Sequence, residues 1–377
     1  MTIPRYIEKQ IFLDLGKKIV LLYGPRQIGK TTIGKRFFSQ EAIYYNCDEE
    51  TTRSLFARAD VATLGPLVER YNRIIIDEAQ RVEDIGIKLK ILYDVFPKKQ
   101  FLVTGSSSFD LAKRLGEPLT GRTFIHLVYP ISLFELQKIV DPVTLRAMIP
   151  DRLIYGSYPE IITTDDYTER RRIIEHVTEH YLFKDILEWQ AVHNSNMLRK
   201  LLTAVALQVG HEVSYTELAS TVGIDKKTVE RYIDICEKAF ILFSLRPYTS
   251  NKRKSISKRK KYFFFDLGIR NTLIQNFNPL ELRSDVGALW ENFVIRERMA
   301  FHASRQAFVN FYFWRSYDGH EVDLIEEENG IVRGLECKWS KSTISKATQK
   351  IFFSEFGGQS LDTINQENIF ATVYKKF

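Results

Sequence analysis

The stretch GPRQIGKTT, residues 24–32, follows the apolar run KIVLLY at residues 18–23 and opens a segment of helical character. It fits the pattern G-x-x-x-x-G-K-[ST], with the strand before it and the helix after it that this pattern requires. Gly24 and Gly29 allow the backbone to curl, so that several N–H groups and a helix N-terminus face the same point. The stretch therefore predicts a loop that binds the phosphates of a nucleotide such as ATP.

Two side chains of this loop have the chemistry of catalysis. The ammonium group of Lys30 is long enough to reach the β- and γ-phosphates, and the hydroxyl group of Thr31 suits Mg²⁺. We therefore predict Mg²⁺ as a cofactor beside ATP. The residues that we expect to contact the nucleotide are Gly24, Pro25, Arg26, Gln27, Ile28, Gly29, Lys30, Thr31 and Thr32.

A second motif, RIIIDEAQ at residues 73–80, ends an apolar run with two acids. The carboxyl ends of parallel strands are where an α/β sheet presents its ligand groups. Asp77 is expected to hold Mg²⁺ through a water molecule, and Glu78 to orient or deprotonate the attacking water. Two acids can also simply close a strand, but that interpretation is weaker beside a phosphate loop.

A further apolar run, FLVTGSSS at residues 101–108, also ends in polar residues. Thr104 or Ser106 could sense the γ-phosphate from this position, which makes Ser106 a candidate catalytic residue. The alternative is an ordinary loop, because Ser and Gly also form loops without any further role.

Residues 1 to about 150 alternate short apolar runs with helix-like stretches. Such alternation indicates a parallel sheet covered by helices on both faces, and hence the α/β class. The predicted strands are KIVLLYG, AIYYNC, RIIIDEA, QFLVTGSSS and TFIHLVYP.

Residues 151 to about 265 are mostly helical in pattern. TERRRIIEHVTEHYLFKDILEW and SNMLRKLLTAVALQVG carry apolar residues at helical spacing. Ser214 and Asp225 can cap two further helices that are joined by a turn at Gly223, which predicts a helix-turn-helix. The runs FILFSLRPY and KYFFFD read as two strands with a charged loop between them, the wing of a winged helix.

The net charge of +7 is concentrated in one place. The stretch NKRKSISKRKK, residues 251–261, contains seven cations and no anion, and without it the chain has 47 basic and 47 acidic residues. A local basic patch suits a polyanion, so we predict DNA binding through this stretch and the helix-turn-helix. A solvated lysine-rich loop is the alternative.

The last part of the chain has a different pattern. A helix, VGALWENFVIRERMAFHA, precedes three strands, FVNFYFWRS, HEVDLIEEE and IVRGLECKW. Asp318-Gly319 and Asn329-Gly330 predict the hairpin turns between these strands. A basic helix, SKATQKIFFSEF, and a final strand, NIFATVYKKF, are expected to follow.

Three acids of this part are candidate ligands of a second Mg²⁺ or Mn²⁺. Asp323 and Glu336 lie on adjacent predicted strands, and Glu291 lies on the preceding helix. Oxygen ligands suit these cations, and Lys338 would position a metal-activated water or stabilise developing charge. The alternatives are a surface ion pair between Glu336 and Lys338, or an inactive domain that is retained for binding.

The motifs together resemble those of a family of bacterial and archaeal AAA-type P-loop ATPases that carry a C-terminal winged helix and a PD-(D/E)xK nuclease-like domain. The matching motifs are GPRQIGKTT, IIIDEAQ, FLVTGSSS, EPLTGRT, YGSYPE, FFFDLGIR and GALWENFVI. The resemblance implies an AAA-like domain at residues 1–150, a helical segment with a winged helix at 151–265, and a mixed α/β, restriction-endonuclease-like domain at 266–377.

The resemblance also implies roles for individual residues. Ser106 would be the sensor that reads the nucleotide state, and Arg122 of the TGRT segment would contact the γ-phosphate, with a position across a subunit interface as one arrangement. That arrangement would require a homo-oligomer. A structural ion pair is the alternative for Arg122. The D…ExK pattern corresponds to Asp323, Glu336 and Lys338, with Glu291 as the acid on the helix.

Two functions compete at this point. The first is an ATP-hydrolysing protein that acts on nucleic acid through the winged helix and the nuclease-like domain. The second is an ATP-dependent switch that binds protein partners and keeps an inactive nuclease-like domain. The N-terminus carries charges where a signal peptide needs an apolar core, and no apolar run approaches a membrane span, so we expect a cytoplasmic protein.

Overall fold

The computed structural model describes residues 3–105, 119–180, 195–249, 259–341, 343–356 and 360–375. The chain divides into two compact units. The N-terminal unit comprises Thr2–Pro130 with Lys238–Phe240, and the C-terminal unit comprises Ile131–Glu237 with Ile241–Phe377.

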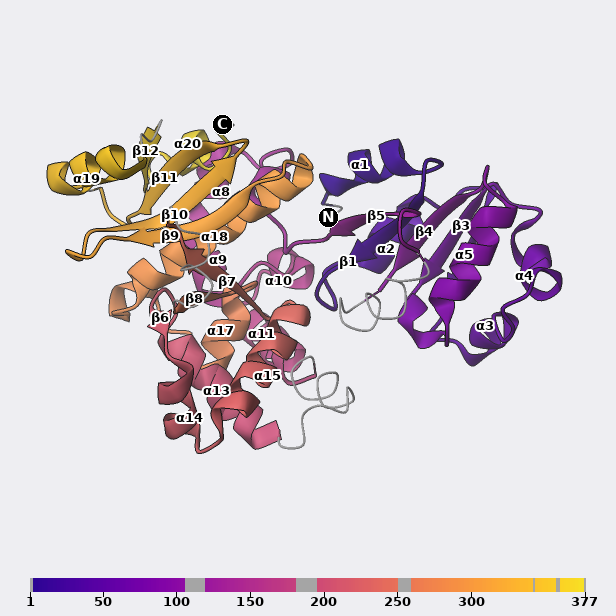
Figure 1. Ribbon diagram of the computed structural model, residues 1–377, viewed down its shortest axis with the longest axis horizontal. Coiled ribbons are helices and arrows are strands. Elements are labelled where there is room, and N and C mark those ends of the chain that lie inside the picture. The colour runs from indigo at the N-terminus through magenta and orange to yellow at the C-terminus, as the bar shows by residue number, and fades with distance from the viewer. Residues whose placement is uncertain are drawn as a thin grey trace. The chain divides into compact units, whose positions relative to one another are not determined.

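The N-terminal unit contains a five-stranded sheet in the order β2-β3-β4-β1-β5, in which every neighbouring pair is parallel. All five predicted runs form strands, so the predicted α/β class is confirmed for this unit (Figure 1). The strands are β1 (Ile19–Tyr23), β2 (Ala42–Asn46), β3 (Arg73–Asp77), β4 (Gln100–Thr104) and β5 (Thr123–Leu127).

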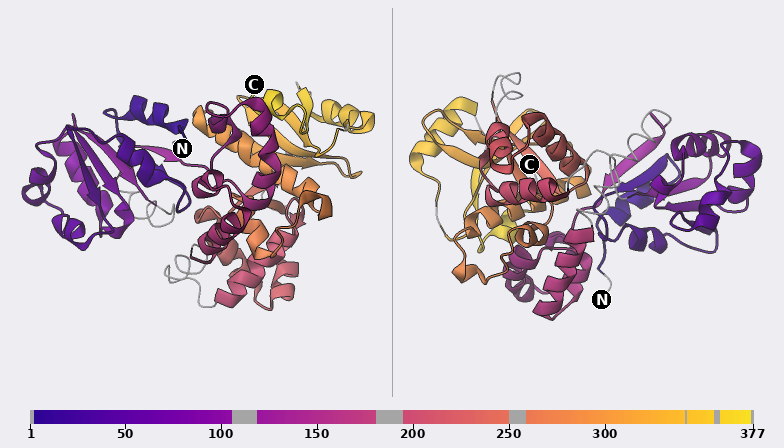
Figure 2. Two further views of the ribbon diagram at one scale, coloured as in Figure 1. Left: turned by 180° about the vertical axis from the view of Figure 1, so that it is seen from behind. Right: turned by 90° about the horizontal axis from the view of Figure 1, so that it is seen from below.

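Helices cover both faces of this sheet, because successive side chains of each strand point to opposite sides. Ile19 and Leu21 of β1 belong to a buried cluster with Leu64 and Leu89, which lie on helices over one face. On the other face, the backbone of Gly34 lies close to Ile75 of β3. The views in Figure 2 show this layering. The helices over the first face are α3 (Glu50–Leu55), α4 (Val61–Val68) and α5 (Ile85–Val95), and those over the second are α1 (Ile7–Asp14) and α2 (Lys30–Arg36).

The C-terminal unit begins with helices, as the 3.6-residue apolar spacing predicts. They are α7 (Leu133–Leu136), α8 (Pro142–Ala147), α9 (Ile149–Tyr155), α10 (Pro159–Thr163), α11 (Tyr167–Glu179), α13 (Ser195–Leu207), α14 (Tyr215–Val222), α15 (Lys226–Lys238) and α17 (Leu267–Leu273). None of the helices in the described part of the chain combines the length and apolarity that a membrane span requires.

The sheet of this unit has seven strands in the order β12-β11-β10-β9-β7-β8-β6. β7 and β8 are the two strands predicted for the wing, and β7 pairs in parallel with β9, the first strand predicted for the nuclease-like part. One sheet therefore crosses the boundary predicted at residue 265. The strands are β6 (Glu212–Val213), β7 (Leu242–Pro247), β8 (Lys260–Phe264), β9 (Asn310–Arg315), β10 (Glu321–Glu328), β11 (Ile331–Cys337) and β12 (Ser360–Ile364).

Two helices pack on opposite faces of the seven-stranded sheet. Helix α18 (Val286–Ser304) hydrogen-bonds through Asn292 to β8, and through Arg298 to Glu326 of β10. Helix α19 (Lys346–Phe356) places Phe352 in a buried cluster with residues of β9, β10 and β11. The hairpin between β10 and β11 turns at Asn329 and Gly330, which both have positive φ, as predicted.

The expected final strand at residues 368–377 is wrong. That stretch contains a short helix, α20 (Ile369–Thr372), and the last strand is β12, which lies earlier and pairs in parallel with β11. The side chain of Asn365 accepts hydrogen bonds from the N–H groups of Glu367 and Asn368, and this turn ends the extended chain. Ile369 and Val373, four residues apart, are then buried on one side of a helical turn.

Candidate functional site

The phosphate loop lies between β1 and α2, at the carboxyl end of β1. Gly24 has φ +148°, and a Cβ atom there would lie 2.5 Å from the carbonyl oxygen of Val128, so a side chain does not fit. Gly29 has φ +95°, in the left-handed region that favours glycine. Both glycines are therefore required by the backbone path that exposes the loop N–H groups.

Lys30 begins α2 and is buried, with 4% of its surface exposed. Its Nζ atom donates to the main-chain oxygens of Gly24 at 2.9 Å and Pro25 at 2.6 Å. These contacts hold the ammonium group over the loop that Gly24 opens. Both of these partners are neutral carbonyl oxygens.

Asp77 ends β3 and collects hydroxyl groups from three other elements. Its Oδ2 atom accepts from Thr31 Oγ1 at 2.7 Å and from Tyr44 OH at 2.5 Å, and its Oδ1 atom accepts from Thr104 Oγ1. Burial, the hydrogen bond to Asp77 and its charge raise the pKa of Tyr44 well above the ordinary value, so the phenol stays a donor. The site brings together Thr31 and Asp77, as predicted from their separate motifs. Nothing in the sequence singled out Tyr44, which reaches the site only because β2 pairs with β3.

The oxygen donors of Thr31 and Asp77 fit Mg²⁺, since hydroxyl and carboxylate oxygens are the ligands that this ion prefers. Both side chains are already within hydrogen-bond reach of each other. A bound Mg²⁺ would supply charge neutralisation for the phosphate oxygens.

Glu78 follows Asp77 with φ 52°, a left-handed conformation that is uncommon for a residue with a side chain. Its N–H donates to Thr104 Oγ1 at 3.2 Å, and its carboxylate accepts from the amide of Gln80. The side chain of Gln80 thus orients the carboxylate of Glu78. Gln80 was not predicted, although it belongs to the same quoted motif.

The structure does not bring Arg122 to the phosphate loop. Arg122 immediately precedes β5, and Thr123 pairs with Ile19 at the start of β1, whereas the loop follows the other end of β1. The guanidinium forms a bidentate pair with Asp94 of α5, at 2.8 and 3.1 Å. The structural alternative therefore fits the geometry within this chain, and contact across a subunit interface stays a prediction. Ser106 lies outside the described residues.

The C-terminal unit contains the second predicted site. Asp323 on β10 accepts a hydrogen bond from the N–H of Cys337, at the end of β11, at 2.8 Å. Burial, followed by the charge of Glu336, raises the pKa of Asp323 to about 7. The predicted pairing of the two strands therefore does place Asp323 beside Glu336.

The other two predicted residues join this cluster. Lys338 Nζ lies 2.7 Å from Glu336 Oε1, and the Lys338 side chain is 43% exposed. Glu291 of α18 lies 3.2 Å from Nζ of Lys261, a residue of β8, and Lys261 also pairs with Glu321. We refer to these six residues as the carboxylate cluster: Lys261, Glu291, Glu321, Asp323, Glu336 and Lys338.

The carboxylate cluster in this arrangement does not fit a divalent cation. Lys261 pairs with Glu291 and Lys338 with Glu336, so two of the three predicted metal ligands already have a cation of the chain as partner. In the described part of the chain, no group of three or more His, Cys, Asp and Glu side chains converges as a metal site would require. The Oε2 atom of Glu336 is nevertheless buried without a hydrogen-bond partner among those residues.

Three family models match the chain. One, described as an AAA domain, matches residues 16–137. Two others, described as domains of unknown function (DUF8612 and DUF4143), match residues 146–280 and 286–360.

Relatives extend over most of the chain. The uncharacterized protein Rv2008c of Mycobacterium tuberculosis is 30% identical over 328 residues, which are 85% of this chain and 70% of that protein. The same values hold for the uncharacterized protein Mb2031c of Mycobacterium bovis. The chain belongs to the same protein family as these two. The uncharacterized protein MJ1544 of Methanocaldococcus jannaschii is 23% identical, over 82% of this chain and 72% of its own length.

The AAA match indicates a P-loop ATPase-like domain that binds ATP with Mg²⁺. It spans β1, the phosphate loop and β3, so the N-terminal unit contains the matched residues 16–130, and the last seven matched residues, 131–137, belong to the C-terminal unit. The matches to the C-terminal unit name no activity.

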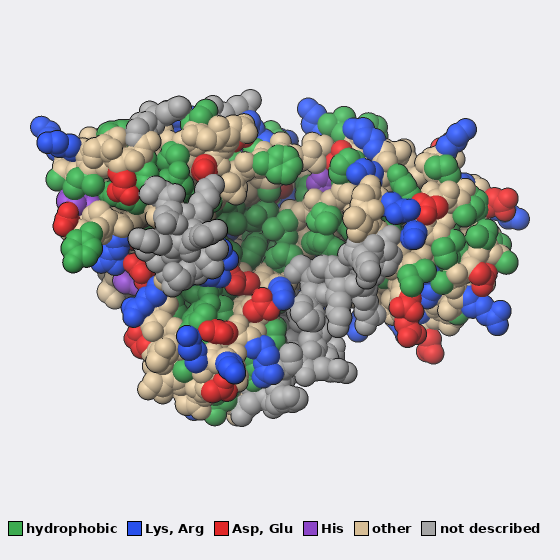
Figure 3. Space-filling model, in the orientation of Figure 1, with side chains coloured by type: hydrophobic (Ala, Val, Ile, Leu, Met, Phe, Trp, Pro, Cys, Tyr) green, Lys and Arg blue, Asp and Glu red, His purple; other side chains and the backbone are tan. Residues whose placement is uncertain are grey.

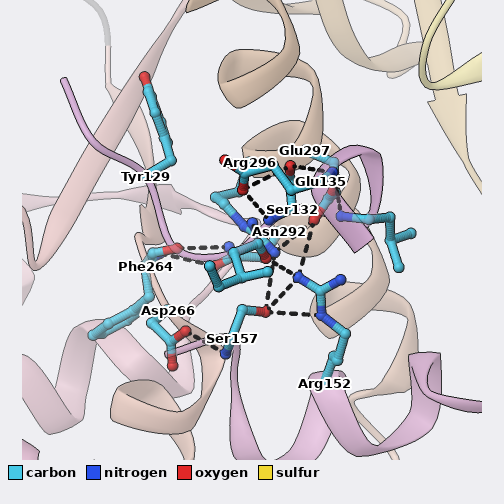
Figure 4. A network of polar contacts seen from close by, with 12 residues as sticks. Tyr129, Ser132, Glu135, Arg152, Ser157, Phe264, Asp266, Asn292, Arg296 and Glu297 are labelled. Atoms are coloured by element: carbon cyan, nitrogen blue, oxygen red, sulfur yellow. Dashed lines mark hydrogen bonds and ion pairs between the residues drawn. The ribbon is translucent and has the colours of Figure 1, made fainter. Parts of the chain in front are cut away.

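Three of the motifs on which the family resemblance rests contribute side chains to a buried polar network in the C-terminal unit (Figure 4). They are YGSYPE, FFFDLGIR and GALWENFVI. Asn292 of GALWENFVI both donates to and accepts from the main chain of Phe264, at 2.8 Å each, as a neighbouring strand would. Asp266 of FFFDLGIR accepts from the N–H of Ser157 in YGSYPE at 2.6 Å. Burial raises the pKa of Asp266 to about 6. The side chains join segments far apart in sequence, so these motifs build the fold.

The same network contains a buried ion cluster that sequence reasoning missed. Arg152 of α9 and Arg296 of α18 both reach Ser157 Oγ, at 2.9 and 3.2 Å, and both pair with Glu297. Glu297 has no exposed surface, and its other oxygen accepts from the N–H of Leu133 at 2.9 Å. The carboxylate of Glu297, Ser157 Oγ and the main-chain oxygen of Ile131 compensate the burial of these guanidinium groups in part, while Nη1 of Arg152 is buried without a hydrogen-bond partner among the described residues.

The structure describes only the last three residues of the basic stretch 251–261, which was predicted to bind DNA. Residues up to 258 lie outside the described residues. Lys260 is half-buried and 3.7 Å from Glu237, and Lys261 is buried in the carboxylate cluster. Strand alternation could have shown that these two lysines face opposite ways.

The predicted helix-turn-helix segments form as expected. Ser214 caps α14 by accepting from the N–H of Glu217, and Asp225 caps α15 by accepting from the N–H of Thr228 at 2.9 Å. Gly223 joins the helices with φ 81°. On the face drawn in Figure 3, basic and acidic side chains alternate over the visible part of these helices.

Proposed function

We propose that this protein hydrolyses ATP at the phosphate loop, with Glu78 as the residue that orients and deprotonates the attacking water. The observation that carries the proposal is the meeting of Thr31 and Asp77, which come from two separate motifs, at one end of the sheet. Lys30 neutralises the β- and γ-phosphates, while Asp77 and Thr31 hold Mg²⁺. The water oxygen bonds to the γ-phosphorus, the bond to the β,γ-bridging oxygen breaks, and Glu78 receives the proton of the water.

The test is Glu78→Gln, which keeps the size of the side chain and removes the base. The variant is expected to bind ATP with near-normal affinity and to hydrolyse it about a hundredfold or more slowly. A fluorescent ATP analogue measures binding, and phosphate release measures hydrolysis. Glu83→Gln is the matched control, because Glu83 is an exposed acid of the following turn. Hydrolysis by Glu78→Gln at the wild-type rate would remove Glu78 from this role.

We also propose that the C-terminal unit acts on nucleic acid, with α14, α15 and the β7–β8 hairpin as a winged helix and residues 266–377 as a nuclease-like domain. The supports are the two capped helices with their glycine turn, the hairpin that follows them, and the exposed cations Lys227 and Arg231 on α15. In this division residues 1–150 form the ATPase domain and residues 151–265 contain the winged helix.

Binding to duplex DNA at several salt concentrations tests this proposal. Each cation that contacts a phosphate contributes about one unit to the slope of log affinity against log salt. The double variant Lys227→Ala, Arg231→Ala should therefore lower affinity and reduce the slope by about two. Lys35→Ala, Lys90→Ala removes the same charge from exposed positions of the ATPase domain and serves as the control. An unchanged slope in the α15 variant would exclude these residues from a DNA contact.

A second candidate is an ATP-dependent switch that binds a protein partner. The observation that favours it is charge pairing: Lys226 of α15 lies 3.7 Å from Glu230, and the lysines of the carboxylate cluster pair with acids of the same unit. Lysines that are paired with acids attract a polyanion less strongly than the seven cations of residues 251–261 would suggest. Absence of DNA binding by the wild-type protein at low salt would favour this second function.

A further inference from the structure

Lys261 is the most enclosed member of the carboxylate cluster. Its surface is 3% exposed, its Nζ atom lies 3.2 Å from Glu291 Oε1 and pairs with Glu321, and it faces the ring of Phe313 at 5.2 Å from the centroid. A buried ammonium group is costly unless carboxylates compensate it. The cluster therefore contains a cation of its own.

The acids around Lys261 are held by groups of the same chain. A Cβ atom at Gly210 would lie 2.7 Å from Glu291 Oε2, so the backbone encloses the second oxygen of that carboxylate. Asp323 accepts from the N–H of Cys337, and Glu336 pairs with Lys338. An ion that bound Glu291 would have to displace Lys261 from Oε1 of that residue.

We propose that Lys261 is the resident cation of the carboxylate cluster, holding Glu291 and Glu321 in the place that a divalent metal ion would take. Lys261 is thus a positioning residue, and the cluster does not bind Mg²⁺ or Mn²⁺ while its ammonium group is seated. This inference rests on the proposed nuclease-like fold only for the expectation that a metal would bind here.

The protonation of the lysine agrees with this arrangement. Burial alone would lower the pKa of Lys261, but the charges of Glu291 and Glu321 outweigh it and raise the pKa above its ordinary value. The lysine remains charged at neutral pH.

Mn²⁺ binding tests the inference in the full-length protein, without nucleotide and in an Asp77→Asn background that removes the predicted Mg²⁺ ligand of the ATPase domain. Electron paramagnetic resonance of free Mn²⁺ gives the affinity directly. Lys261→Met replaces the ammonium group by an apolar side chain of similar length and should raise Mn²⁺ affinity about tenfold or more. Adding Glu291→Gln to it should return the affinity to the starting value.

Lys260→Met is the matched control, because it removes the same charge from the neighbouring position of β8, where the lysine pairs outside the cluster with Glu237. Its Mn²⁺ affinity should equal that of the parent. Circular dichroism checks that each variant is folded, and Lys261→Gln takes the place of Lys261→Met if the latter unfolds.

Two results would overturn the inference, and they differ in what they say of the proposed function. Tight Mn²⁺ binding by the parent that Glu291→Gln abolishes would refute Lys261 as the resident cation and support a metal-dependent nuclease-like site. Folded Lys261 variants that gain no Mn²⁺ would refute it and leave the cluster without a metal role. Neither result bears on ATP hydrolysis, which Glu78→Gln tests separately.

Discussion

Asp77 of the N-terminal unit and Glu291 of the C-terminal unit are both buried acids, but their partners differ in kind. Asp77 accepts from the hydroxyl groups of Thr31, Tyr44 and Thr104, which are neutral. Glu291 pairs with the ammonium group of Lys261. The carboxylate charge is thus retained at the first site and cancelled at the second.

The difference indicates which site is prepared for a charged ligand. Neutral hydroxyl donors orient an acid while leaving its charge available, so that Mg²⁺ and a nucleotide can complete the charge balance. Internal ion pairs complete that balance without a ligand, and a metal must then compete with a cation that is already in position. Residue composition alone does not separate these cases, because both sites contain acids and lysines.

The largest effect is expected at Lys30. Lys30→Ala removes the cation that faces the phosphates, and we expect ATP hydrolysis to fall about a thousandfold, which is about 4 kcal/mol of transition-state stabilisation. Phosphate release under saturating ATP and binding of a fluorescent ATP analogue measure the two parts of the loss. Lys35→Ala is the control, since Lys35 lies exposed on the same helix. Equal hydrolysis by both variants would contradict the interpretation of this site as prepared for a ligand.

The next largest effect is a loss of folding stability at Glu326, a buried acid that is paired with an arginine. Glu326 of β10 accepts from Nε and Nη2 of Arg298, at 2.6 Å each, and neither side chain is exposed. Glu326→Gln leaves the guanidinium charge buried without compensation, which should destabilise the protein by about 3 kcal/mol. Urea unfolding measures this change, with the exposed Glu281→Gln as the control.

The pH dependence of the same pair gives an independent check. Burial raises the pKa of Glu326, but the charge of Arg298 and hydrogen bonds from His302 and Arg298 lower it to about 2, from an ordinary value of 4.5. The stability that the pair contributes is therefore fully present above pH 4.5 and is lost as the pH falls through 2. The difference in unfolding free energy between wild type and Glu326→Gln should shrink across this interval. A constant difference would show that the charge of Glu326 is not its source.

The sequence predicted the phosphate loop well because the required residues are local. Gly24, Gly29, Lys30 and Thr31 lie within nine residues. Strand β3 runs parallel to β1 through β4, which places Asp77 at the same end of the sheet as the loop. Lys261 was counted with the basic stretch predicted to bind DNA, because its partner Glu291 is 30 positions away and meets it only when α18 packs on β8. Long-range packing of this kind has no local signal.

Strand direction explains the other differences. Arg122 directly precedes the predicted strand TFIHLVYP, and the parallel pairing of β5 with β1 places that end of the strand away from the phosphate loop. The register of Asp323 and Glu336 was predictable, since the Asn329-Gly330 turn fixes the hairpin. The charge state of the cluster that they enter was not, because it depends on β8, a strand from another part of the chain.

The smallest predicted loss of folding stability is at Lys338, which is partly exposed, whereas Lys261 of the same carboxylate cluster is buried. Because the Lys338 side chain is 43% exposed, its pair with Glu336 is screened by solvent, and Lys338→Ala should cost about 1 kcal/mol of folding stability or less. The loss should shrink further in high salt, as thermal unfolding at low and high ionic strength would show. Lys341→Ala, which breaks an exposed pair with Glu367, is the control with no measurable effect expected. A loss of stability as large as that of Glu326→Gln would mean that Glu336 is as desolvated as Glu326. Lys338 would then compensate a buried carboxylate in the same way as Lys261. A small loss would leave Glu336, whose Oε2 atom is unpartnered in the described structure, as the acid through which an outside ligand enters first.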